Sequence, residues 1–352
     1  MSQETGQARQ GLLERLAQGP VICAEGYLFE LERRGYLQAG AFVPLVVLEY
    51  PDLVAQLHRE FVHAGSDVVE AFTYYAHREK LRLIGREGDL EAMNTHALTI
   101  AKEVASETGS LLAGNVCNTN VFVPDGTQAK ATVRAMFEEQ VAWAAQAGAD
   151  FVIAETISWG EEALIALDVI KSAGLAAVVT LAIHREPETR EGWSPAEACR
   201  RLEDAGADVV GLNCSRGPRT MLPLLQMIRG SVQVPMAALP VPYRTTSEQP
   251  SFQSLRDPEG DEATDGIPFP TALDPFTCTR HELARFAATA VAMGIDYLGA
   301  CCGAGPHHVR AMAEALGRTP PASQYSADMT KHAFMGTDAS ITAEQKDYAA
   351  RL

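Results

Sequence analysis

The segment Asp296-Tyr-Leu-Gly-Ala-Cys-Cys-Gly-Ala-Gly-Pro-His-His308 is a short apolar run that ends in two adjacent cysteines and then in glycines before an expected helix. Neighbouring side chains on a strand point to opposite faces, so Cys301 and Cys302 can converge only where the strand ends and the backbone turns. Gly303 and Gly305 give the backbone that freedom. We therefore expect both thiols at the end of a buried strand.

A related junction precedes this segment and three other apolar segments. Its four copies are Ala64-Gly-Ser-Asp67, Ala147-Gly-Ala-Asp150, Ala205-Gly-Ala-Asp208 and Met293-Gly-Ile-Asp296. In each copy glycine is expected to end a helix, and a strand is expected to begin directly afterwards. The repeat indicates that helices and strands alternate along the chain.

Eight apolar segments fit this alternation as strands. They cover residues 21–27, 67–73, 111–116, 150–156, 176–183, 208–214, 234–239 and 296–301, and helical patterns such as 45–63, 89–107 and 129–147 separate them. Short continuous apolar strands between helices are typical of a parallel sheet covered on both faces. Eight such units predict an α/β fold of the (β/α)8 TIM-barrel class, because an open sheet usually has fewer strands and carries a glycine-rich phosphate loop, which is missing here.

Two segments fall outside the alternation. Residues 239–275, after the seventh strand, are rich in Pro, Ser, Thr, Asp and Glu and are too long for an ordinary connection, so we expect an ordered excursion or a lid. We assign residues 1–318 to the barrel and residues 319–352 to a C-terminal tail used for subunit contact. A homo-oligomer, dimer or tetramer, is therefore expected.

Composition narrows the class of partner. The 352 residues carry a formal net charge of -16, which argues against nucleic acid as a partner, because phosphate binding needs clustered Lys and Arg. No apolar run approaches the length of a membrane span, and the polar N-terminal residues show no signal pattern. The seven cysteines lack the dense spacing of a disulfide scaffold. We expect a cytoplasmic protein that acts on small molecules.

A third cysteine, in Gly211-Leu-Asn-Cys214, ends the sixth expected strand. The carboxyl ends of barrel strands meet at one mouth, so Cys214 is expected close to Cys301 and Cys302. Three thiolates can hold Zn²⁺ and leave its fourth position open. The alternatives are a buried thiol pair or a strained disulfide between the adjacent cysteines.

Other polar and aromatic residues also fall at expected strand ends. These are Glu25 after the first strand, Thr73, Tyr74 and Tyr75 after the second, and Glu155 on the fourth. Glu155 could instead be a satisfied structural carboxylate, and Tyr74, Tyr75 and Phe42 could serve only packing.

The expected site suits one kind of chemistry. Zinc held by three thiolates is electron-rich, which favours binding and ionising a substrate thiol over making hydroxide. A thiolate in line with a methyl group on a positively charged nitrogen or sulfur gives direct methyl transfer, and aromatic faces bind such cations. The pattern thus predicts methyl transfer to a thiol.

The chain resembles the homocysteine S-methyltransferase family over nearly its whole length, and most closely the betaine-dependent branch. The matching motifs are Gly211-Leu-Asn-Cys214, Leu298-Gly-Ala-Cys-Cys-Gly303, Leu31-Glu-Arg-Arg-Gly-Tyr36, Gln56-Leu-His-Arg-Glu-Phe61, Phe72-Thr-Tyr-Tyr-Ala76 and Ile153-Ala-Glu155. The resemblance implies a (β/α)8 barrel, Zn²⁺ on Cys214, Cys301 and Cys302, homocysteine as methyl acceptor, and methionine as product.

The resemblance also implies roles for the acceptor site. Glu155 matches the family glutamate that holds the amino group of homocysteine, and we assign Glu25 and Thr73 to the same subsite. Where the betaine-dependent enzymes have Asp-Gly-Gly after the first strand, this chain has Ala24-Glu25-Gly26. Glu25 is therefore expected to reach the ammonium from one residue later.

For the methyl donor the resemblance implies a site lined by Tyr75, Tyr74 and Phe42. Phe42 replaces a family tryptophan, and Thr156 stands where a betaine-site tyrosine would be. His332 is the loose equivalent of a tail residue that reaches a neighbouring subunit's donor site. A betaine-like donor is the first expectation, S-methylmethionine or dimethylsulfoniopropionate the second, and a non-catalytic thiol- or metal-binding subunit the third.

Overall fold

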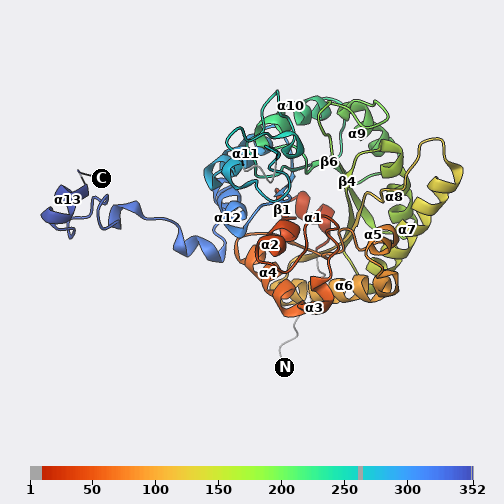
Figure 1. Ribbon diagram of the computed structural model, residues 1–352, viewed down its shortest axis with the longest axis horizontal. Helices are drawn as coiled ribbons and strands as arrows, with labels where there is room; N and C mark the ends of the chain where they lie inside the picture. The colour runs from red at the N-terminus through yellow and green to blue at the C-terminus, as the bar shows by residue number, and fades with distance from the viewer. Residues whose placement is uncertain (1–9, 261–264, 350, 352) are drawn as a thin grey trace.

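The computed structural model describes residues 10–260, 265–349 and 351, and its centre is a closed barrel of eight parallel strands (Figure 1). The strands follow one another around the barrel in chain order, and β8 pairs with β1. They are β1 (Val21–Ala24), β2 (Val68–Glu70), β3 (Leu111–Cys117), β4 (Phe151–Ile157), β5 (Ala176–Leu181), β6 (Val209–Asn213), β7 (Met236–Leu239) and β8 (Tyr297–Ala300). The predicted barrel is confirmed.

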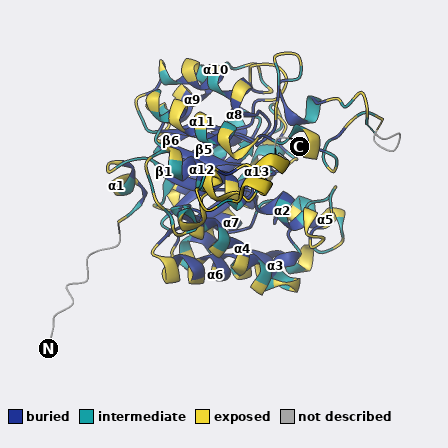
Figure 2. Ribbon diagram, turned by 90° about the vertical axis from the view of Figure 1, so that its left-hand side faces the viewer, coloured by how far each residue is buried: buried dark blue, intermediate teal, exposed yellow. Residues whose placement is uncertain are grey.

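Helices surround the strands and bury their outer faces (Figures 1 and 2). The α-helices are α1 (Leu12–Leu16), α2 (Tyr27–Arg33), α3 (Val46–Glu49), α4 (Pro51–His63), α5 (Arg78–Leu83), α6 (Leu90–Thr108), α7 (Thr127–Ala147), α8 (Gly160–Ser172), α9 (Pro195–Asp204), α10 (Pro218–Arg229), α11 (Arg280–Ala292), α12 (Pro306–Ala315) and α13 (Ala343–Ala349). Short 3-10 turns are η1 (Glu87–Asp89), η2 (Phe252–Ser254), η4 (Asp274–Phe276), η5 (Pro321–Tyr325) and η6 (Met329–Lys331). Within the described ranges no helix is both long and apolar enough to cross a membrane.

The repeated Gly-x-Asp junction has a structural cause. Its glycines adopt positive φ, as at Gly148 with 79° and Gly294 with 77°, which ends the helix and turns the chain toward the sheet. The carboxylates of Asp67, Asp150 and Asp208 accept the backbone N–H of Ile22, Leu112 and Ala177 at 2.8, 2.7 and 2.8 Å. Each aspartate thus binds the start of the preceding strand, so three of the four junctions tie neighbouring strands into register.

The single helix predicted over residues 45–63 is wrong in one respect. The chain forms α3 and α4 with a break at Tyr50, whose φ of -140° and ψ of 59° are not helical. Pro51 causes the break, because it disfavours a helical conformation in the preceding residue and lacks an N–H to continue the ladder. As the first residue of α4, Pro51 instead fits the new helix.

The excursion after β7 is ordered where it is described, and residues 261–264 lie outside the described residues. Tyr243 bridges to Thr277, and the ring of Phe252 stacks on Tyr243 at 5.8 Å and meets Phe269 edge-on at 4.9 Å. The excursion therefore packs over the barrel mouth near β8. The tail beyond α12 projects away from the barrel and ends in α13 (Figure 1).

Candidate active site

Three thiols meet at the carboxyl ends of β6 and β8. The sulfur of Cys302 lies 3.9 Å from that of Cys214 and 3.8 Å from that of Cys301, and all three sulfurs lie within 4.8 Å of one another. All three cysteines are free, and these separations far exceed the S–S bond length of about 2.05 Å, so the disulfide alternative is wrong. Tetrahedral ligands at the usual Zn–S length of about 2.3 Å are about 3.8 Å apart, so the thiols fit zinc without rearrangement.

Backbone strain accompanies this cluster. Cys214 and Ser215 adopt φ of 56° and 57°, a left-handed conformation that costs a residue with a side chain roughly 1–3 kcal/mol. The thiols of Cys214 and Cys301 both lie within hydrogen-bond reach of the sulfur of Cys302. Interaction with Cys301 and Cys302 lowers the pKa of Cys214 well below its ordinary value. The same interaction raises the pKa of Cys301 and of Cys302 well above theirs. The three thiols are therefore close enough that ionisation of one changes the pKa of the other two.

The turn that carries Cys302 is fixed from outside the barrel. Gly303 has a φ of 94°, and a Cβ placed on it would lie 2.2 Å from the hydroxyl oxygen of Tyr243. Arg33 donates to the carbonyl oxygen of Gly303 at 3.2 Å and to the hydroxyl of Tyr243 at 2.9 Å. A helix after β1 and the excursion after β7 thus hold the cysteine turn together.

Buried carboxylates from three strands lie beside the thiols. Asn213 donates to Glu155 at 2.6 Å and to Glu25 at 3.3 Å, while Asn115 donates to Glu155 at 2.6 Å and also to Glu70. We call Glu25, Glu70 and Glu155 the carboxylate cluster. It lines a cavity of about 20 Å³ that also touches Cys301 and Cys302. Glu70 was not predicted, although an acid within the apolar strand 67–73 was a signal for it.

The electrostatics of the carboxylate cluster favour a bound cation. Burial raises the pKa of Glu155 to about 7. Burial first, and the charge of Glu155 second, raise the pKa of Glu25 and of Glu70 well above ordinary values. One oxygen of Glu25 is buried and has no hydrogen-bond partner among the described residues. An ammonium group in this cavity would satisfy that oxygen and offset the repulsion.

Thr73, predicted for the same subsite, is placed differently. It is buried, and its hydroxyl donates to the carbonyl oxygen of Asn115 at 2.8 Å. The residues that line the small cavity include its neighbours Phe72 and Tyr74. Its visible contact is therefore with the backbone of β3.

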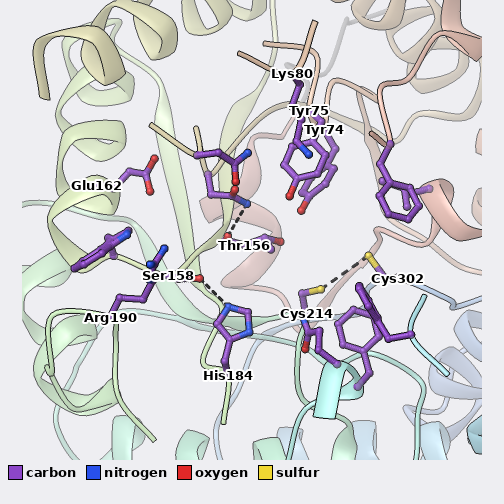
Figure 3. Close-up of a pocket in the computed structure, with 18 of the residues that line it drawn as sticks. Tyr74, Tyr75, Lys80, Thr156, Ser158, Glu162, His184, Arg190, Cys214 and Cys302 are labelled. Atoms are coloured by element: carbon purple, nitrogen blue, oxygen red, sulfur yellow. Dashed lines mark hydrogen bonds between the residues drawn. The ribbon is translucent and has the colours of Figure 1, made fainter. Parts of the chain in front are cut away.

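A larger cavity of about 770 Å³ opens above the thiols (Figure 3). Tyr74, Tyr75 and Phe42 line it together with Cys214 and Cys302, so the structure brings the predicted donor residues and two of the thiols together. The rings of Tyr74 and Tyr75 lie 4.3 Å apart, and the ring of Phe42 lies 5.8 Å from that of Phe29.

The tail residue His332 lies apart from this cavity in the single chain. Its ring nitrogen Nδ1 accepts backbone N–H groups of Phe334 at 3.2 Å and Met335 at 3.1 Å. It thus stabilises a turn of the projecting tail (Figure 1).

Several lining residues escaped prediction because they sit on loops without a motif. The imidazole of His184 lies 2.9 Å from the hydroxyl of Ser158 and 3.1 Å from that of Ser215 (Figure 3). The guanidinium of Arg190 lies 4.7 Å from the ring centre of Trp159. His184 thus lies beside the residue that follows Cys214, whereas Arg190 lies farther from the thiols (Figure 3).

Comparison with known proteins gives consistent matches. The family model described as homocysteine S-methyltransferase matches residues 25–316. The chain is 35% identical to S-methylmethionine–homocysteine S-methyltransferase BHMT2 of Pongo abelii, over 90% of this chain and 85% of that protein. It is 36% identical to betaine–homocysteine S-methyltransferase 1 of Danio rerio, over 94% of this chain and 81% of that protein.

A solved structure shares the fold. The homocysteine methyltransferase MmuM from Escherichia coli, in its metallated form, superposes with a TM-score of 0.66 over 85% of this chain and 98% of that chain. Sequence identity is 18%, so this likeness bears on the fold alone. The two curated relatives name different methyl donors, and the identities do not separate them.

Proposed function

The chain belongs to the homocysteine S-methyltransferase family, and from that membership we propose that it moves a methyl group from a betaine-like onium donor to the homocysteine thiol, with Zn²⁺ on Cys214, Cys301 and Cys302. The observation that carries the proposal is the meeting of these thiols with the carboxylate cluster on one side and the aromatic cavity on the other. Methionine is the product.

The zinc assignment rests on the donor set. Three sulfurs within 4.8 Å of one another, two of whose separations are 3.9 and 3.8 Å, suit Zn²⁺. Bound there, the ion supplies the positive charge that keeps an acceptor thiol ionised near neutral pH.

The carboxylate cluster is assigned to the amino group of homocysteine. Glu25 and Glu155 share the amide of Asn213, which holds both acids toward one cavity beside Cys301. An ammonium bound between them keeps the acceptor thiol at the mouth of the barrel. Orientation of this kind is a large part of the catalysis available to a bimolecular transfer.

The aromatic cavity is assigned to the donor. The acceptor sulfur attacks the methyl carbon, the bond from that carbon to the donor nitrogen or sulfur breaks, and the bonding electrons neutralise the onium charge. Tyr74, Tyr75 and Phe42 surround the space next to Cys302 where the methyl group would lie. Their rings attract the cation before transfer and lose that attraction when its charge disappears.

A sulfonium donor, S-methylmethionine or dimethylsulfoniopropionate, is the second candidate. The ammonium of Lys80 lies 3.8 Å over the ring of Tyr75, so one face of that ring already carries a cation. Phe42 also offers a weaker π face than tryptophan. Both features weaken the attraction of the aromatic rings for a quaternary ammonium. In addition, one of the two curated relatives cited above is named for S-methylmethionine.

The tail and the cellular setting complete the proposal. Tyr325, Met329, Met335 and Tyr348 are exposed on the tail at 73, 56, 67 and 51%. We assign the tail to contact with a second copy in a dimer or tetramer, where His332 would approach the partner's donor cavity. Free buried thiols suit a reducing compartment, and we place the enzyme in the cytoplasm.

Metal analysis and a donor panel test the proposal. The purified protein should hold one zinc per chain and should form methionine from homocysteine with glycine betaine, dimethylsulfoniopropionate or S-methylmethionine. Cys302→Ala should lose both zinc and turnover, while Cys199→Ala, on α9, should keep both. Zinc-free active protein would refute the mechanism, and calorimetric binding of homocysteine without turnover on any donor would support a non-catalytic binding subunit.

A further inference from the structure

Two cationic side chains line the large cavity, and among the described residues neither has a carboxylate within ion-pair distance. Lys80 is half-buried, and its sequence neighbour Glu79 is occupied by Arg82 at 2.7 Å. Arg190 stacks over Trp159 on the opposite wall. Neither charge therefore forms an ion pair among the described residues, although the charge of Arg190 still lowers the pKa of Glu162.

The acid nearest to these cations in the cavity wall is already bound. Glu162 lines the cavity, and one of its oxygens accepts the backbone N–H of Thr119 at 2.8 Å and its hydroxyl at 2.6 Å. Other cations on the barrel do form ion pairs, as Lys171 does with Asp208 at 2.7 Å, and buried Arg216 donates to backbone carbonyl oxygens instead. With a formal net charge of -16 the chain has acids in excess, so two cations left without acids in one cavity need another explanation.

Their position matches the donor's remote end. In Figure 3 the thiols of Cys214 and Cys302 lie on one side of the cavity, Lys80 lies beyond the ring of Tyr75, and Arg190 lies on the far side. A donor whose methyl group points at the thiols can extend into the part of the cavity that these two cations line.

We propose that Lys80 and Arg190 form an anion subsite that selects onium donors carrying a carboxylate, an inference that rests on the proposed function. The lysine offers a compact point charge, and the arginine offers a planar fork suited to carboxylate. An anionic group would otherwise be repelled by the negative molecule, so local cations are needed to admit it. The subsite thus excludes onium compounds whose remote end is neutral.

A purely structural role for Arg190 has a matched control on the same molecule. Arg201 stacks over Trp193 outside the cavity, with its guanidinium carbon 4.1 Å from the ring centre, and also forms an exposed ion pair with Glu197. Such an exposed pair contributes little to stability. If Arg190 only packs on its indole, Arg190→Gln and Arg201→Gln should behave alike. If it binds the donor, the two variants should separate.

The test uses donor pairs that differ only in the remote charge: glycine betaine with glycine betaine amide, and dimethylsulfoniopropionate with its amide. Binding to the zinc-loaded full chain is measured by calorimetry without homocysteine, and KM is measured separately. The carboxylate form of at least one pair should bind at least about 10-fold tighter than its amide. Lys80→Met and Arg190→Gln should each remove most of that preference. Arg190→Gln should leave amide binding and thermal stability unchanged, as Arg201→Gln does, whereas Lys80→Met should bind the amide no more weakly than the wild type, because it frees one face of Tyr75.

Other results overturn the inference. The two cations do not recognise the donor's carboxylate if acid and amide bind equally in both pairs, or if neither carboxylate binds. The same conclusion follows if both variants weaken acid and amide binding equally. Selective binding of a carboxylate donor without any methyl transfer would sink the proposed function and leave the subsite standing. If methyl transfer from every donor is the same in the wild type and in both variants, the proposed function stands and the anion subsite is wrong.

Discussion

Glu25 follows the last residue of β1, and its side chain lines the small cavity beside Cys301. Asn213 holds it beside Glu155, yet one of its oxygens stays buried without a partner among the described residues. A buried charge that is only partly satisfied costs stability unless a ligand completes it. Glu25 therefore favours binding of an ammonium group at the expense of the unliganded fold.

The substitution Glu25→Gln tests whether Glu25 lowers stability without ligand and strengthens ammonium binding. Relative to the wild type, Glu25→Gln should gain melting temperature as the pH rises, because burial and the charges of Glu155 and Glu70 oppose ionisation of the wild-type acid. It should also weaken homocysteine binding by about 10-fold or more, the usual loss for a charge-assisted hydrogen bond. Thermal denaturation and calorimetry on the zinc-loaded protein measure both effects.

Glu162→Gln provides the control for that substitution. It is a buried carboxylate on the donor side that accepts two hydrogen bonds from Thr119, so its loss should lower the melting temperature and leave homocysteine affinity unchanged. Wild-type homocysteine affinity in Glu25→Gln would remove Glu25 from the acceptor site.

Residue types alone predicted part of the site. The cysteines were found because each ends an apolar strand, and their spacing in the structure fits one ion. Asn213 was given no role although it lies within the motif that ends at Cys214, because its partner Glu25 lies 188 positions away and only closure of the barrel brings them together. Lys80 and Arg190 were missed because loop side chains become cavity walls only after the strands are placed.

At the level of elements, the eight strands were predictable because each is buried on both faces and so reads as a continuous apolar run. The ends of the strands were predicted less accurately: the sequence predicts a strand over residues 67–73, but β2 covers only Val68–Glu70. The following residues leave the sheet, and Tyr75 adopts a φ of 62° as its side chain enters the cavity wall. Residues of the site therefore lie where the chain leaves the regular strand.

The turn after β8 can be tested by adding one methyl group. Gly303→Ala should cost about 3 kcal/mol or more of unfolding free energy and lower zinc content, because positive φ and overlap with Tyr243 act together. Gly317 has a φ of 76° and open space around it, so Gly317→Ala should cost only about 1–2 kcal/mol and keep zinc. Similar losses in both variants would mean that Tyr243 yields and that the turn is not fixed from outside.

Helix α4 carries a buried histidine that should make stability depend on pH. Burial lowers the pKa of His58 from 6.5 to about 3, and neither ring nitrogen has a partner among the described residues. Between these values the unfolded chain binds a proton that the folded chain does not, so stability is full above pH 6.5 and falls as the pH decreases. The contribution lost between pH 7 and pH 5 is about 2 kcal/mol.

His58→Phe should abolish that contribution, since the ring would still pack against Tyr27, whose centroid lies 4.7 Å away. Denaturant unfolding at pH 7 and pH 5 gives the difference, in which acids common to both proteins cancel. His63→Gln, on an exposed position of the same helix, should behave like the wild type. An unchanged slope in His58→Phe would show that His58 finds water or a partner on protonation.

Across the whole molecule, the barrel buries its apolar side chains within one chain, whereas the tail leaves large apolar side chains exposed. Exposed Tyr325 and Met335 lie on a segment that projects from the barrel (Figure 1). Apolar side chains in such a position usually mark a contact surface. A second copy is the partner that would always be present at matching concentration.

The double substitution Tyr325→Ser and Met335→Ser should therefore lower the assembly state without unfolding the barrel. Light scattering should give a dimer or tetramer of the 37.9 kDa chain for the wild type and a smaller species for the variant. Zinc content and homocysteine affinity should persist, because the thiols and the carboxylate cluster lie within one barrel. If the tail also carries His332 into the partner's donor cavity, the KM for the donor should rise as the assembly is lost. A monomeric wild type, or an unchanged assembly in the variant, would separate the tail from oligomerisation and leave the donor cavity to be completed by its own chain.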